Sequence, residues 1–425
     1  MNIPIERFAL ANGLRVVLSQ DRSTPVVAVN LWYNVGSRNE RPGRTGFAHL
    51  FEHMMFQGSQ NVPDTQHIAH VEHVGGAVNG STWLDRTNYY ETMPAHQLEL
   101  ALWLESDRMG FLLPAMTQEK LDNQRDVVKN ERRWRVDNRP YGDWDEKLQA
   151  LVFPPDHAYH HSVIGSMADL DAASLEDVQE FFRTFYAPNN AVLAICGDFD
   201  SGAARAAVER YFGPIPHGPP LPPIPGPALL PLPSGEEVRE TVHAEVGLPR
   251  VYLAFRIPAY GTDHFYPLDV ASHVLGHGKS SRLYRSLVRE QRIAQDVAAF
   301  AFPLVHGAAM LVMWATVARG KNPAQVEAAL LHEVAALAEN AADQEVERAI
   351  TGIDAHQTIG LQQVGERADQ LAMFTTLWDD PDHINTELDR YRAVSAAAVR
   401  QAAARFFGSN NRVVLWYLPR ATEAV

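Results

Sequence analysis

The stretch SLEDVQEFFRTFYAPNNAVLAI at residues 174–195 follows the same order of residue types as the stretch SAAAVRQAAARFFGSNNRVVLW at residues 395–416. Each contains a serine that can cap a helix, an amphipathic helical pattern that ends on two aromatic residues, an Asn-Asn turn and an apolar strand. The two stretches lie at a constant offset, and their agreement predicts an internal duplication, with chance similarity of two helices as the alternative. We therefore expect two homologous halves.

A proline-rich segment separates the two halves. Residues 213–233 contain ten prolines, which remove backbone donors and favour extended geometry. The sequence thus predicts a first domain over residues 1–212, a semi-rigid linker over 213–235 and a homologous second domain over 236–425.

Both halves also open on a similar strand pattern. Apolar, β-branched runs at residues 14–19 and 26–32 flank a DRSTP turn, and the second run leads through Gly36 into a helix. In the second half, the run 251–255 is followed by a turn and by a helix from Pro267. These patterns predict an α+β fold in which each domain is an antiparallel sheet backed by helices.

Composition excludes several classes of protein. The chain has 425 residues, with 51 acidic against 37 basic side chains and a net charge of -14, and no basic cluster that would bind nucleic acid. Its single cysteine, Cys196, cannot form an intrachain disulfide, and the first residues lack the features of a signal peptide, so we predict a cytoplasmic protein. The apolar runs are too short for a membrane span, so no membrane partner is expected.

The segment His49-Leu50-Phe51-Glu52-His53 carries the clearest chemical signal. It lies in a helical pattern between Thr45, which can act as N-cap, and Gly58, which can end the helix. Positions i, i+3 and i+4 of a helix share one face, so both imidazoles and the carboxylate converge. Two neutral imidazoles suit Zn²⁺, and a nearby carboxylate that is not a ligand can take a proton from a water at the metal.

A catalytic zinc site with an open position needs a third protein ligand. Glu131 lies near the end of a long helical pattern that starts at Leu121, and Gln124 lies on the same face two turns earlier. A carboxylate on this second helix could complete the ligand set. The alternative is that two surface helices hold these groups by chance.

These motifs give the chain a specific resemblance. It resembles the pitrilysin and insulinase superfamily of inverzincin peptidases, in the subgroup similar to mitochondrial processing peptidase, from about Phe8 to the final strand. The matching residues are Gly46 to Met54, Gly75 to Thr82, Asp85 to Tyr90, Arg125 to Glu131, and Ile164-Gly165.

The resemblance implies one zinc ion per chain, held by His49, His53 and Glu131, with Glu52 polarising the attacking water. It also implies a chamber between two homologous halves that face each other. The function expected from it is a zinc-dependent endopeptidase that hydrolyses peptides or unfolded polypeptide segments.

A four-residue segment resembles the strand on which family members bind substrate. Residues Asn79, Gly80, Ser81 and Thr82 match the family's edge strand, to which a peptide adds as a further strand through main-chain hydrogen bonds. An ordinary structural strand after the preceding Gly-Gly turn is the alternative.

The chain also departs from the family pattern. Gln124 stands where members often carry a carboxylate, so we expect it to contribute a hydrogen bond to a ligand and no charge. Self-sufficient members present an arginine and a tyrosine seven residues apart in the second half. The corresponding positions here are Val288 and Gln295, or in a shifted register Arg289 and Asp296.

The missing Arg and Tyr pair predicts that this chain is the zinc subunit of a heterodimer. A homologous inactive subunit would then supply both residues. The alternatives are a non-catalytic scaffold or binding subunit of the same superfamily, and a self-sufficient homodimeric peptidase.

Other histidines carry weaker signals. His67, His70 and His73 recur at every third residue, which favours a solvated helix face over an accessory metal site. His160 and His161 lie in a loop before Ile164, where we expect a packing role or a place near substrate.

Overall fold

The computed structural model describes residues 2–420 and forms two compact units. Unit 1 comprises Met1–Arg132, His161–Pro225 and His356–Thr386, and unit 2 comprises Arg133–His160, Gly226–Ala355 and Glu387–Val425. Met1 and residues 421–425, which the predicted domains include, lie outside the described residues. Each unit has one sheet with helices packed on it, which confirms the predicted α+β class.

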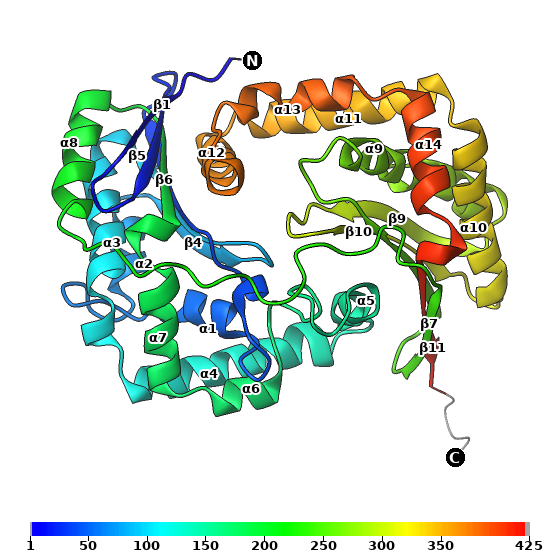
Figure 1. Cartoon of the computed structure of the whole chain (residues 1–425), viewed down its shortest axis with the longest axis horizontal. Coiled ribbons are helices and arrows are strands. Elements are labelled where there is room, and N and C mark those ends of the chain that lie inside the picture. Colours follow the sequence, from blue (N-terminus) through cyan, green and yellow to red (C-terminus); the bar gives the residue numbers. More distant parts are fainter. Residues whose placement is uncertain (1, 421–425) are drawn as a thin grey trace. The chain divides into compact units, whose positions relative to one another are not determined.

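Unit 1 contains a six-stranded sheet in the order β1-β2-β6-β3-β5-β4 (Figure 1). Its strands are β1 (Glu6–Ala9), β2 (Arg15–Gln20), β3 (Val26–Tyr33), β4 (Ala77–Thr82), β5 (Thr87–Pro94) and β6 (Ala191–Gly197). Its helices are α1 (Phe47–Met54), α2 (Gln66–His73), α3 (Leu98–Phe111), α4 (Gln118–Arg132), α6 (Met167–Ala172), α7 (Leu175–Phe185), α8 (Ser201–Phe212) and α12 (Val364–Trp378). Short 3-10 turns lie at η1 (Ser37–Asn39), η2 (Ala95–Gln97), η3 (Leu113–Ala115) and η5 (Pro188–Asn190).

Unit 2 contains a five-stranded sheet in the order β7-β11-β8-β10-β9. Its strands are β7 (Val238–Ala244), β8 (Arg250–Ile257), β9 (Ala294–Phe302), β10 (Ala309–Val317) and β11 (Arg412–Pro419). Its helices are α5 (Trp144–Val152), α9 (Phe265–Gly276), α10 (Pro323–Asn340) and α14 (Ala396–Phe406), with π-helices η4 (Arg133–Asp137) and η6 (Tyr284–Glu290) and the 3-10 turn η7 (Ser409–Asn411). Helices α11 (Asp343–Gly360) and α13 (His383–Arg392) each include residues of both units.

Apart from the additional strand β1 in unit 1, the two sheets have the same strand arrangement. In unit 1, β2 pairs with β6 in parallel, and β6-β3, β3-β5 and β5-β4 are antiparallel. In unit 2, β7 pairs with β11 in parallel, and β11-β8, β8-β10 and β10-β9 are antiparallel. The prediction of antiparallel sheets therefore needs one correction, because each sheet contains one parallel pair: β6 inserts beside β2 in unit 1, and β11 inserts beside β7 in unit 2.

The duplicated stretches make the same local hydrogen bonds in both halves. The Ser174 and Ser395 side chains accept from the third backbone N–H of the helices they precede. The Asn190 side chain donates to the Phe185 carbonyl at 2.8 Å, and Asn411 donates to the Phe406 carbonyl at 2.7 Å. The second asparagine of each turn therefore binds the C-terminal end of its helix, which explains the repeated Asn-Asn turn.

Helices cover both faces of the unit 1 sheet. On one face, Leu31, Leu193 and Ile195 pack in a core that includes Leu50 and Phe51 of α1. On the other face, Trp32, Ala194 and Cys196 pack against α12. Figure 1 shows α12 beside β6. Helix α12 comes from the second half of the sequence, yet it completes the core of unit 1.

The unit 2 sheet receives a helix from the first half in the same way. Trp144 at the start of α5 stacks on Tyr252 of β8 with ring centroids 5.5 Å apart, and it also contacts Phe300 and Trp314. Helices α9, α10 and α14 pack on strands of the same sheet. Each unit therefore contains a helix that the other half of the sequence encodes. The predicted domain boundaries, which divide the chain into contiguous halves, stay a prediction.

Candidate metal centre and substrate strand

Helix α1 holds the histidine motif and begins later than the sequence predicts. Its first residue is Phe47, preceded by Gly46 with φ 86°, and no side chain of the preceding residue caps it. Thr45, the predicted N-cap, instead donates through its hydroxyl to Asp169 at 2.6 Å. Glu40 takes the capping role, because its carboxylate accepts from the backbone N–H of Gly46 at 2.9 Å and of Ala48 at 2.7 Å.

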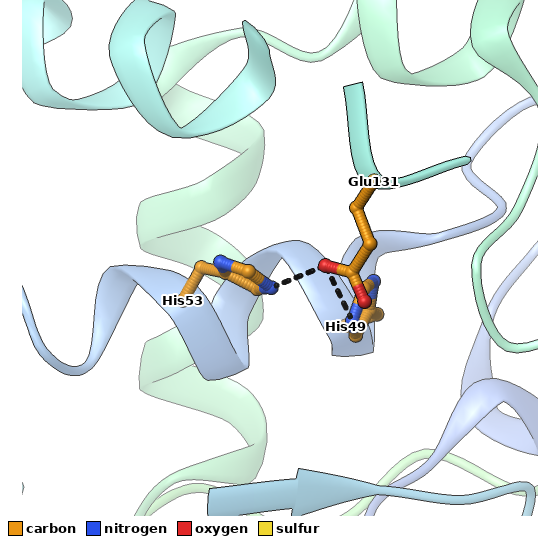
Figure 2. A group of neighbouring side chains, drawn as sticks. All are labelled: His49, His53 and Glu131. Atoms are coloured by element: carbon orange, nitrogen blue, oxygen red, sulfur yellow. Dashed lines mark ion pairs between the residues drawn. The ribbon is translucent and has the colours of Figure 1, made fainter. Parts of the chain in front are cut away.

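The structure brings three of the predicted site residues together. The Nε2 atom of His53 lies 3.3 Å from Glu131 Oε2, and the Nε2 atom of His49 lies 3.8 Å from the same oxygen. Figure 2 shows both imidazoles on one face of α1 directed at the carboxylate, which comes from the last turn of α4. One ligand atom from each residue lies within 4.8 Å of the others.

The donor set and its spacing fit zinc. Two imidazole nitrogens and one carboxylate oxygen are ordinary zinc ligands, and tetrahedral coordination at about 2.0–2.2 Å separates the donors by roughly 3.4 Å. The observed separations of 3.3 and 3.8 Å need only a small adjustment to reach that value. The three side chains are 12–22% exposed, so the site opens to solvent enough to admit a further ligand.

A close backbone contact joins the two ligand-bearing helices. A Cβ atom on Gly165 would lie 2.3 Å from the backbone nitrogen of Gly46, so only glycine permits this approach to the start of α1. The Gly165 carbonyl accepts from Arg132 Nη1 at 2.7 Å, and Arg132 follows Glu131 at the end of α4. The loop that holds Gly165 therefore binds both helices at once.

His161 supports the start of α1 from the same loop. Its Nε2 lies 2.9 Å from Glu40 Oε2, and the Glu40 side chain is 0% exposed. Burial opposes the charged form of His161, but the hydrogen bond to Glu40 and the charge of that residue outweigh it and raise the pKa of His161 above 6.5. Burial likewise raises the pKa of Glu40, which the His161 hydrogen bond partly offsets.

Glu52 lies near His53 and Glu131 but is not one of the three residues whose ligand atoms converge. Burial raises the pKa of its carboxyl above the ordinary value, and a hydrogen bond from the Thr82 side chain opposes that rise. Glu52 lies between the two histidines in the sequence, and its hydrogen bond with Thr82 places it against strand β4. Its role as a general base stays a prediction.

Strand β4, which contains Asn79, Gly80, Ser81 and Thr82, forms one edge of its sheet. It pairs with β5 alone, in the register Asn79↔Tyr90 to Thr82↔Thr87. A Cβ atom on Gly80 would lie 3.1 Å from the Tyr89 ring and 3.2 Å from the Phe56 ring, so a larger residue would crowd both rings. The outer edge of β4 has the main-chain groups that strand addition uses.

Gln124 occupies the predicted face of α4. It is 7% exposed and lies two turns before Glu131 on the same helix. Its hydrogen bond to a ligand stays a prediction.

A second cluster, formed by His67, Glu91 and Glu105, also has metal-ligand spacing. His67 Nε2 lies 2.7 Å from Glu91 Oε1, and burial lowers the pKa of His67 to about 3 and raises that of Glu91 to about 7. Arg108 is buried with this cluster and donates through Nε to Glu105 at 2.9 Å. Because the guanidinium of Arg108 already balances the carboxylates of this second cluster, the cluster of His49, His53 and Glu131 suits a metal better.

The structure corrects one expectation for this region. His67 is 3% exposed, so α2 does not present all three of its histidines to solvent. Its position is set by contacts with β5, which the spacing of the histidines did not reveal.

Comparisons with known proteins identify the family of the chain. Residues 15–149 match the family model described as insulinase, peptidase family M16, and residues 172–353 match the model described as peptidase M16 inactive domain. The chain is 32% identical over 354 residues to the zinc protease PqqE of Helicobacter pylori, covering 81% of this chain and 76% of that protein. The chain belongs to the insulinase family of peptidases.

Two further relatives cover nearly the whole chain. An uncharacterized zinc protease of Streptomyces coelicolor is 26% identical over 418 residues, covering 95% of this chain and 87% of that protein. The crystal structure of a protease from Helicobacter pylori superposes with a TM-score of 0.92 at 25% identity and covers 99% of this chain and 100% of that one. Among residues 2–420, none of the helices of this family member combines the length and apolar character needed to cross a membrane.

The resemblance places Val288 and Gln295, or Arg289 and Asp296, at the positions where self-sufficient members have the Arg and the Tyr. Gln295 and Asp296 lie on β9, the edge strand of the unit 2 sheet, and Val288 and Arg289 lie on η6. Asp296 accepts from the Thr316 hydroxyl at 3.1 Å. Arg282, another arginine of this region, is bound to Glu345 at 2.6 Å and therefore acts within the core of unit 2.

We expect the stability that His161 contributes to depend on pH. The charged form of His161 stabilises the fold below pH 6.5, and this contribution is lost as pH rises through its higher folded-state pKa. The Tm difference between wild type and His161→Gln should therefore be largest below pH 6.5 and shrink as the pH rises above that value.

The neighbouring substitution His160→Gln serves as the control, because the His160 ring contacts the Phe153 carbonyl and not Glu40. A Tm difference for His161→Gln that stays constant over the pH range would show that its charge contributes nothing.

Proposed function

We propose that this chain is a zinc-dependent endopeptidase that hydrolyses peptides or unfolded polypeptide segments. The observation that carries the proposal is the convergence of His49, His53 and Glu131 to 3.3–3.8 Å, with Glu52 beside them. The names of the relatives, which are zinc proteases, support the same reaction class.

In this proposal His49, His53 and Glu131 hold one zinc ion. Bound there, zinc supplies a Lewis acid for the scissile carbonyl and lowers the pKa of the attacking water toward about 7. Glu52 accepts the proton of that water on a carboxylate oxygen and delivers it to the nitrogen of the leaving amine. The Thr82 side chain, which hydrogen-bonds Glu52, keeps the carboxylate directed at the reacting atoms.

Substrate binds in the proposal as an additional strand on β4. The unpaired edge of β4 supplies main-chain donors and acceptors at Asn79 to Thr82, which recognise a backbone with little dependence on sequence. An extended chain is required for this pairing, so unfolded segments and peptides are the expected substrates. Gln124 stays the proposed hydrogen-bonding neighbour of the metal ligands.

We further propose that the chain works as the zinc subunit of a heterodimer, with an enclosed chamber between homologous halves. Val288 and Gln295 replace the Arg and Tyr of self-sufficient members, and residues 172–353 match the model of an inactive domain. A homologous partner would supply the residues that hold substrate over the metal. A scaffold role has less support, because a scaffold has no need for a base beside three ligand groups.

Replacing the proposed base should separate metal binding from turnover. Glu52→Gln keeps all three ligands, so we expect one zinc per chain and a loss of about 10²–10⁴ in kcat on an internally quenched peptide. Glu131→Gln should lose zinc as well, because it removes a ligand. Metal content and turnover are measured on the same preparations.

The exposed residue Glu119 on the first turn of α4 provides the control, and Glu119→Gln should retain both zinc and activity. Full activity of Glu52→Gln would contradict the assignment of the base.

The proposed heterodimer is tested by mixing this chain with a homologous chain. We expect the zinc-loaded chain to cleave a quenched peptide library only with a homologous chain that carries the Arg and Tyr seven residues apart. Cleavage by this chain alone, abolished by Glu52→Gln, would contradict the heterodimer and support a self-sufficient homodimer.

A further inference from the structure

A polar network lies on the sheet face that α12 covers in unit 1. One oxygen of Asp369, on α12, accepts three hydrogen bonds: from Asn30 Nδ2 at 3.1 Å, from Trp32 Nε1 at 2.8 Å and from Asn88 Nδ2 at 2.8 Å. The three donors come from strands β3 and β5. Apolar side chains of α12 and of the sheet pack on the same face, where Arg15 and Arg367 make further polar contacts between the helix and the rest of unit 1.

The network continues from Asp369 to the edge strand. Asn88 Oδ1 accepts from Ser81 Oγ at 2.7 Å, and these two residues are also register partners between β4 and β5. Arg86 Nη1 donates to the Ser81 carbonyl at 2.9 Å and to its hydroxyl at 2.6 Å. Ser81 is therefore bound on one side by an amide that Asp369 orients and on the other by a guanidinium.

Electrostatic interactions also link Arg86 to Asp369 and Glu52. The guanidinium of Arg86 lies 5.4 Å from the centre of the Trp32 ring and is largely buried. Among the charged groups that act on it, Asp369 is the strongest and Glu52 the next. The cation that holds Ser81 thus lies in the field of both the α12 carboxylate and the proposed base.

An edge strand depends on such side-chain contacts more than an inner strand does. Strand β4 has one neighbouring strand, β5, and its other edge is the surface on which substrate would pair. Thr82, next to Ser81, contacts Glu52. A displacement of Ser81 would therefore alter both the main-chain surface for substrate and the support of the base.

We propose that Asp369 is a positioning residue for substrate binding, which fixes strand β4 through Asn88, Ser81 and Arg86. A helix from the second half of the sequence then determines the geometry of the strand to which a peptide adds. The inference rests on the proposed function, because it assigns the role of this network in peptide binding.

The test substitutes two residues of α12, Asp369 and Arg367, which lie two positions apart. Asp369→Ala removes the acceptor of three hydrogen bonds and the anion that faces Arg86. Asp369→Asn keeps an acceptor oxygen but removes the charge. Arg367→Gln is the control, because Arg367 binds Asp21 at 2.6 Å, also docks α12 on unit 1 and does not contact the network.

Peptide affinity provides the first measurement. Each variant is placed on the zinc-loaded Glu52→Gln background, and the Kd of a fluorescein-labelled, unstructured peptide longer than β4 is determined by anisotropy. We expect Asp369→Ala to raise Kd roughly tenfold, Asp369→Asn to raise it less and Arg367→Gln to leave it within about twofold. In the active enzyme, the loss should appear in KM and leave kcat nearly unchanged.

Hydrogen exchange provides a second measurement that does not require activity. Asp369→Ala should accelerate amide exchange in residues 77–82, and Arg367→Gln should not, although both substitutions can lower Tm. Equal peptide affinity and equal exchange in the two variants would overturn the inference. If the wild-type chain, together with the proposed partner, neither binds nor cleaves peptide, the proposed function fails, and the exchange of β4 alone decides whether Asp369 positions it.

Discussion

The contact between Gly46 and Gly165 is the constraint on which the candidate site depends. The histidines lie on α1 and the glutamate on α4, and neither helix contains the whole ligand set. A loop that approaches Gly46 without a side chain and also accepts a hydrogen bond from Arg132 fixes the start of one helix against the end of the other. Any side chain at Gly165 would have to separate them, because its Cβ would overlap the Gly46 backbone at 2.3 Å.

Helix exchange between the two halves of the sequence gives the second half a structural task. Helix α12 completes the hydrophobic core of unit 1, and α5 places Trp144 on the sheet of unit 2. A first half without α12 would expose Trp32 and Cys196 and leave Asn30 and Asn88 without the carboxylate they bind. The second half of the sequence is therefore part of the folded unit that holds His49, His53 and Glu131.

Short sequence patterns predicted the features that residues close together in the chain determine. The i, i+4 spacing of His49 and His53 determines a shared helix face, and the repeated Asn-Asn turns determine equivalent bonds to the preceding helices. The placement of Glu131 required a second helix, and its assignment came from a helical pattern together with the family resemblance. The edge position of β4 followed from the resemblance as well, because strand order is not readable from a single strand.

Contacts between distant segments could not be predicted from the sequence. Glu40 and His161 are 121 residues apart, and no periodicity joins them, so the buried pair that caps α1 had no signal. An amphipathic pattern shows that α12 buries one face but not which sheet receives it. His67 was expected on a solvated face because the three histidines recur at every third residue, yet the buried carboxylate of Glu91 provides its partner.

The most direct test of the account is the location of the bound metal by anomalous diffraction at the zinc edge, on crystals of the zinc-loaded chain. We predict one strong anomalous peak within coordination distance of His49 Nε2, His53 Nε2 and a Glu131 carboxylate oxygen, at about 2.0–2.2 Å from each. A peak at His67, Glu91 and Glu105, or none at the first cluster under zinc saturation, would contradict the central claim.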